Sequence, residues 1–98
     1  MGSKHCVWEN TTSYKQGEDK TEVRKTSLTA GEFRIIVTRY VGFDKELVMH
    51  CAALGISVRT LDTEDMEEGQ QKALKVADSA VKRIAYAIDQ AMRINHER

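Results

Sequence analysis

Residues 64–94, EDMEEGQQKALKVADSAVKRIAYAIDQAMRI, carry the clearest structural pattern in the chain. Its apolar residues recur at alternating spacings of three and four, which is typical of one face of an amphipathic helix. The seam consists of Leu74, Ala77, Val81, Ile84, Ile88 and Ala91. A parallel row at spacing seven widens the stripe with mostly small side chains, and it consists of Ala73, Ala80, Ala87 and Ile94. We therefore predict a long C-terminal helix with a broad apolar face.

Charges at the two ends of this stretch fit the same helix. Acidic residues crowd its start, and Arg93 and Arg98 lie at its end, an arrangement that opposes the helix dipole. We predict that the helix begins near Glu64, with Thr63 or Asp62 as its cap. At 1.5 Å per residue, about 30 residues span roughly 45 Å, more than a sheet of short strands can cover. Part of the seam should therefore overhang and is a candidate for self-association in a homodimer.

The chain ahead of the helix favours strands. Residues 4–14 and 22–29 are rich in β-branched and aromatic types, and EFRIIVTRYV at 32–41 carries the strongest strand pattern. The run ELVMHCAALGI at 46–56 is apolar on both parities, so it is either a strand covered on two sides or a short buried helix, and we favour the strand. Residues 57–61 form a connection with room for a few paired residues.

These segments predict an α+β fold, a three- to four-stranded antiparallel meander packed by the helix. Length leaves room for a single domain over residues 1–98, with the sheet in 4–61 and the helix in 62–98. Residues 1–3 have the composition of a vector-derived extension.

A glycine at the turn gives a register for the central hairpin. Gly31 suits a three-residue loop over residues 29–31, which would place Val23 opposite Val37. Alternation then assigns Phe33, Ile35, Val37 and Val41 to the core face. Arg39 has the core parity, and because an unpaired buried charge is costly, it needs a partner such as Glu22.

The other face of the hairpin is the candidate binding surface. In this register it carries Arg24, Arg34, Ile36 and Tyr40, with Phe43 on the following turn as a further candidate contact. Aromatic side chains beside cations are typical of surfaces that bind single-stranded nucleic acid, and an ordinary solvated or protein-binding sheet face has the same composition. The fifteen basic and fifteen acidic residues cancel, which favours the protein-binding interpretation.

Catalytic and metal-binding interpretations find little support. His5-Cys6 and His50-Cys51 are two adjacent pairs, and neighbours in a strand point to opposite faces, so neither pair can chelate one metal ion. The glycines stand singly, without a phosphate-binding loop. We interpret both cysteines as free thiols and expect no enzyme activity and no cofactor. Without an apolar stretch long enough for a membrane span, we expect a cytoplasmic protein.

The order of features resembles small phage and prophage accessory proteins. It comprises an early Trp8, the hairpin strand AGEFRIIVTR at 30–39, ALGI at 53–56 and a long alanine-rich helix. Some proteins of that kind inhibit bacterial defence, anti-CRISPR proteins among them, by binding and blocking a host complex. The resemblance implies a non-enzymatic interaction protein with a protein partner.

Two functional hypotheses therefore remain at this point. The first is a phage-type protein-interaction domain that blocks a host complex. The second is a small module that binds nucleic acid or a nucleotide with the outer sheet face.

Overall fold

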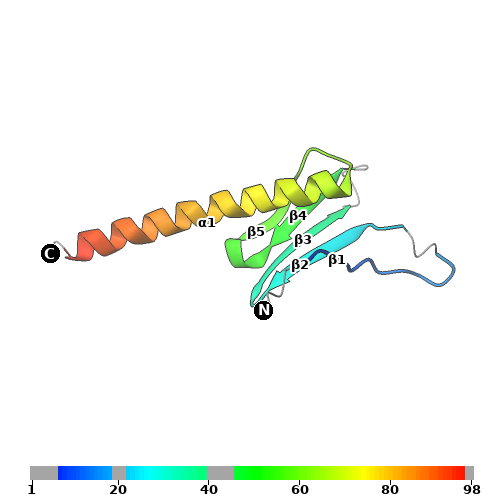
Figure 1. The fold of residues 1–98 in the computed structure, drawn as a ribbon, viewed down its shortest axis with the longest axis horizontal. Coiled ribbons are helices and arrows are strands. Elements are labelled where there is room, and N and C mark those ends of the chain that lie inside the picture. Colours follow the sequence, from blue (N-terminus) through cyan, green and yellow to red (C-terminus); the bar gives the residue numbers. More distant parts are fainter. Residues whose placement is uncertain (1–6, 19–21, 40–45, 97–98) are drawn as a thin grey trace.

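The computed structural model describes residues 7–18, 22–39 and 46–96. Five strands form one antiparallel sheet in the order β1-β2-β3-β4-β5, a meander in which each strand pairs with its sequence neighbours (Figure 1). They are β1 Glu9–Asn10, β2 Lys25–Ala30, β3 Phe33–Arg39, β4 Leu47–Cys51 and β5 Ile56–Thr60. The 3₁₀ helix η1 Ala52–Leu54 separates β4 from β5, and helix α1 Met66–His96 follows.

The α+β class is confirmed, but the predicted strand count of three to four is too low. The difference comes from the segment after Gly55, where β5 pairs with β4 over Val48↔Thr60 and Met49↔Arg59. Gly55 takes a left-handed conformation (φ 71°) and its N–H donates to the Ala52 carbonyl. Because glycine adopts this conformation without steric cost, the chain reverses in one short turn and leaves enough residues for a strand.

The hairpin register differs from the predicted one. Ala30 pairs with Phe33 and Thr26 with Val37, so the loop has two residues, Gly31 and Glu32, instead of three. Gly31 has φ 62° at the first loop position, as a type II′ turn requires. The predicted register would have set Lys25 opposite Ile35 on the core face, whereas the observed one pairs it with Thr38. The observed register places the buried Thr26 and the half-buried Leu28 on the core face in place of a lysine, which explains the shift.

The apolar run at 46–56 is a strand in its first part, as favoured. All of β4 except the half-buried His50 is buried, on both faces of the sheet. Continuous burial accounts for the loss of apolar–polar alternation in its sequence. The short-helix alternative applies only to η1.

Helix α1 packs on one face of the sheet with its smallest side chains. Its buried residues are Gly69, Ala73, Ala77 and Ala80, which contact β3, β4 and η1. A Cβ at Gly69 would lie 2.7 Å from Leu47 Cδ1, so the helix axis approaches the sheet closely here. The core beneath consists of Ile35, Val37, Leu47, Met49, Cys51 and Leu61.

The helix begins two residues later than predicted and has a different cap. The N–H of Glu68 donates to Asp65 Oδ2 (2.9 Å), so Asp65 caps α1 in place of Thr63 or Asp62. Thr63 Oγ1 instead accepts from the Asp65 N–H. The Arg39 guanidinium donates to the Glu64 carbonyl (3.0 Å), and Glu22, its expected partner, pairs with Arg24.

The predicted overhang is present. In Figure 1 the orange and red part of α1 runs beyond the sheet, and every residue from Val81 to His96 except Gln90 is exposed. About half of the helix, roughly 24 Å at 1.5 Å per residue, therefore projects from the domain.

Candidate interaction surfaces

The projecting half of α1 presents a continuous apolar stripe. Val81, Ile84 and Ile88 of the predicted seam are 45%, 46% and 55% exposed. Leu74 and Ala91 are also exposed, whereas Ala77 is only 4% exposed because it packs on the sheet. Of the six residues in the predicted seam, one is therefore buried inside the domain and five are exposed.

A groove forms where the helix leaves the sheet. One wall consists of Val81, Ile84, Ala85 and Ile88, and the other of Phe33, Ala53 and Leu54. The groove has a volume of about 390 Å³ and is lined only by apolar residues. The η1 wall was missed from the sequence, because only the turn after β4 brings Leu54 beside a helix residue thirty positions later.

The outer face of the sheet carries two of the predicted partner-binding residues. Arg34 and Ile36 lie there and line a hollow of about 560 Å³ together with His50, Ala52, Gly55, Ile56 and Ser57. Arg34 Nη2 donates to Ser27 Oγ at 3.3 Å. Tyr40 and Phe43, the aromatic members of the predicted surface, lie outside the described residues.

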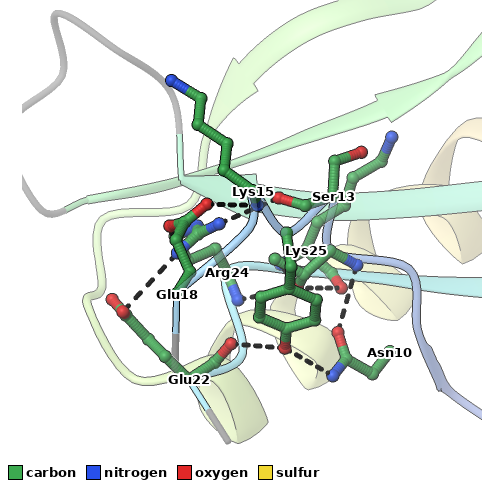
Figure 2. Close-up of polar contacts among 9 residues, drawn as sticks. Asn10, Ser13, Lys15, Glu18, Glu22, Arg24 and Lys25 are labelled. Atoms are coloured by element: carbon green, nitrogen blue, oxygen red, sulfur yellow. Dashed lines mark hydrogen bonds and ion pairs between the residues drawn. The ribbon is translucent and has the colours of Figure 1, made fainter. Parts of the chain in front are cut away.

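Arg24 lies elsewhere than predicted. It precedes β2, and the Arg39 N–H donates to its carbonyl, which gives it the parity of Thr26 on the helix side. Its guanidinium forms ion pairs with Glu18 (3.0 Å) and Glu22 (3.5 Å) and donates to the Ser13 carbonyl (Figure 2). The three-residue change of register is the reason for this displacement.

The same cluster joins the residues that follow β1 to those that precede β2. Arg24 lies over the Tyr14 ring at 5.5 Å, and the Tyr14 hydroxyl donates to the Glu22 carbonyl (2.6 Å) (Figure 2). The Lys15 N–H donates to Glu18, and this bond, together with the charges of Arg24 and Lys15, lowers the pKa of Glu18 against a smaller opposing effect of burial. Arg24 is therefore engaged in holding these two segments together.

The side chains of His50 and Cys51 point to opposite faces of the sheet, as predicted. Cys51 is a free, buried thiol in the core beneath α1, and His50 lines the outer hollow. Over the described ranges, no three His, Cys, Asp or Glu side chains gather where they could hold a metal ion. His5 and Cys6 lie outside those ranges.

Within the described part of the chain, no helix is both long enough and apolar enough to span a bilayer. The 31 residues of α1 have sufficient length but carry charged residues throughout.

Comparison with protein-family models, curated proteins and solved structures found no match to this chain. The resemblance to phage accessory proteins therefore stays a prediction.

Proposed function

We propose that this protein is a non-enzymatic protein-interaction domain whose contact surface is the distal half of α1, paired with the same segment of a second copy. The observation that supports this proposal most directly is the exposure of Val81, Ile84 and Ile88. They belong to a helix that extends beyond its own sheet. A row of large aliphatic side chains in water is unfavourable by roughly 25 cal/mol per Å² of apolar surface. Pairing removes this surface from solvent.

The stripe is complementary to itself in an antiparallel arrangement. Setting Ile84 against Ile88 of a second copy also sets Val81 against Ala91, so a large side chain meets a small one in the outer layers. The two-fold axis then crosses the pair at the level of residue 86, between the two stripes. The antiparallel arrangement also opposes the two helix dipoles.

The apolar groove gives the second helix a place on the domain. In this register Ala91 and Met92 of the second copy approach Val81, next to Leu54 on the groove wall. Methionine fills irregular apolar gaps well because its unbranched chain adapts to them. The contact is smaller than a standard interface, so we expect dissociation in roughly the micromolar range.

Sedimentation velocity over a wide concentration range tests the pairing. The wild-type chain should move from monomer to dimer as its concentration rises, and the double variant Ile84→Glu/Ile88→Glu should remain monomeric. Both side chains are about half exposed in the monomer, so circular dichroism of the variant at low concentration should match the wild type. Tyr86→Glu is the matched control, since Tyr86 is 66% exposed on the opposite side of the helix. Its dimerisation should be unchanged.

Spin labels distinguish the orientation. A nitroxide at position 93, in a background without Cys6 and Cys51, should lie about 20 Å along the axis from its counterpart in the antiparallel pair. A parallel pair would place the two labels at the same level, with no separation along the axis. A wild-type chain that stays monomeric at the highest concentration, or a double variant that dimerises equally well, would refute the pairing.

Inhibition of a host complex, which the resemblance implies, stays a separate prediction. Its contact would be the outer sheet face at Arg34 and Ile36, so the dimer leaves that face open. Capture of one specific protein from a bacterial lysate, lost in an Arg34→Glu variant that keeps its fold, is the expected result.

A further inference from the structure

A groove between β5 and α1 gathers three cations. Arg59 comes from the strand, and Lys75 and Arg83 come from the helix, with Ser79 and Val76 completing the lining. The groove has a volume of about 240 Å³ and lies on the flank of α1 away from the apolar stripe. It is therefore independent of the proposed dimer surface.

The fold explains why these residues meet. β5 is an edge strand, and Arg59 pairs with Met49 of the core, so Arg59 lies on the sheet face that α1 covers. Lys75, Ser79 and Arg83 are spaced by four and share one side of the helix. The sequence contains the helical spacing, but only the packing of α1 brings the strand cation beside it.

These cations differ from the others on the helix. Lys72, Lys82 and Arg93 each have a carboxylate four residues earlier as an ion-pair partner. Over the described residues, Arg59, Lys75 and Arg83 have no ion pair with a carboxylate. In a chain of zero net charge, three cations in one groove without an ion-pair partner among the described residues form a local field that attracts anions.

An exposed aromatic ring continues this flank. Tyr86 lies three residues after Arg83 and seven after Ser79, on the same side of the helix, and is 66% exposed. Cations along a groove next to an aromatic ring are the combination that binds single-stranded nucleic acid, in which cations contact the phosphates and a base stacks on the ring. The sequence predicts such a combination on the outer sheet face, and this flank of α1 carries a second one.

We propose that Arg59, Lys75, Ser79 and Arg83 bind the phosphodiester backbone of single-stranded nucleic acid, with Tyr86 stacking on a base. The groove is smaller than the roughly 300–1,000 Å³ of pockets that enclose a whole organic ligand, so it suits a phosphate group. The row from Lys75 to Arg83 is about 12 Å long, more than one phosphate spans. Guanidinium groups grip phosphate oxygens through two N–H donors, and the Ser79 hydroxyl supplies another. Recognition is independent of base sequence.

Fluorescence anisotropy of a labelled oligothymidine tests the site with the full chain. The logarithm of the association constant should fall with the logarithm of salt concentration with a slope of about −2, as for three phosphate contacts on a single strand. The triple variant Arg59→Gln/Lys75→Gln/Arg83→Gln should abolish this slope. Tyr86→Ala should keep the slope and weaken binding roughly 5- to 150-fold, the range for one stacked base.

The matched control removes three positive charges elsewhere. Lys15→Gln/Lys25→Gln/Arg34→Gln lies in the loop and sheet and should leave affinity and slope within about twofold of wild type. No binding of the wild type at low salt, or equal loss in both triple variants, would overturn the site. Displacement of the oligonucleotide by inorganic tripolyphosphate at equal phosphate concentration would overturn the nucleic-acid assignment and indicate a small-anion site.

Discussion

The two halves of α1 follow the same seven-residue pattern but meet different surroundings. From Met66 to Ala80 the helix lies on the sheet and buries Gly69, Ala73, Ala77 and Ala80, all without a large side chain. From Val81 to His96 it lies beyond the sheet, and its large residues Ile84 and Ile88 are about half exposed. Small side chains let the first half approach the sheet closely, while large ones equip the second half for a partner.

The largest expected effect on the free energy of unfolding is at the contact between the first half of α1 and the sheet. Leu47→Ala removes a fully buried side chain beneath the first half of the helix, and we expect the free energy of unfolding to fall by about 2–5 kcal/mol. Ile94→Ala is the matched change in the second half, where the side chain is exposed, and should stay within about 0.5 kcal/mol. Urea unfolding at low protein concentration measures both. Equal losses would show that the two halves are not energetically distinct.

A smaller effect on the free energy of unfolding is expected at Gly69, where the helix lies close to the sheet. Alanine there favours helix by about 1 kcal/mol, but its Cβ would lie 2.7 Å from Leu47 Cδ1. Because Leu47 is fully buried and has little room to move, we expect Gly69→Ala to lower the free energy of unfolding by about 1 kcal/mol net.

A double-mutant cycle provides the control for this contact. In a Leu47→Ala background the obstructing methyl group is gone, and the same Gly69→Ala change should stabilise the protein by about 1 kcal/mol. The same sign in both backgrounds would contradict a close approach of helix and sheet at this point.

The smallest effect concerns the loop at the opposite end of the sheet. The folded-state pKa of Glu18 is lowered from its usual value of 4.5, mainly by the Lys15 N–H bond, so its contribution is present above that value and is lost as pH falls through the folded pKa. Glu18→Gln should therefore lower the thermal midpoint slightly at neutral pH, and the gap should close in acid. Glu9→Gln is the exposed control. A difference in thermal midpoint that widens in acid would contradict the lowered pKa of Glu18.

Several features could be predicted because they depend on local pattern. The helix and its overhang follow from the seam and from the length of α1, and β3 and β4 follow from their β-branched and apolar runs. The strand β5 was harder to predict because ISVRT has no strong alternation and depends on pairing with β4. The hairpin register failed because one glycine is compatible with loops of two or three residues.

The candidate surfaces divide in the same way. Val81, Ile84 and Ile88 could be named from spacing alone, and all three are about half exposed in the structure. Arg24 was misplaced because its face depended on the register. Arg59 was missed, since nothing near it in sequence indicates that its neighbours are Lys75 and Arg83.

A long amphipathic helix that follows a short antiparallel sheet and exceeds it in length can be predicted from sequence, because periodicity and rise per residue are local properties. The side of that helix that meets the sheet depends on tertiary packing. The periodicity identifies an apolar stripe that is several residues wide. Which part of that stripe faces the sheet depends on how closely the backbones of helix and sheet can approach each other. Ala73, Ala77 and Ala80 allow the closest packing, so they face inward, and Val81, Ile84 and Ile88 remain for a partner.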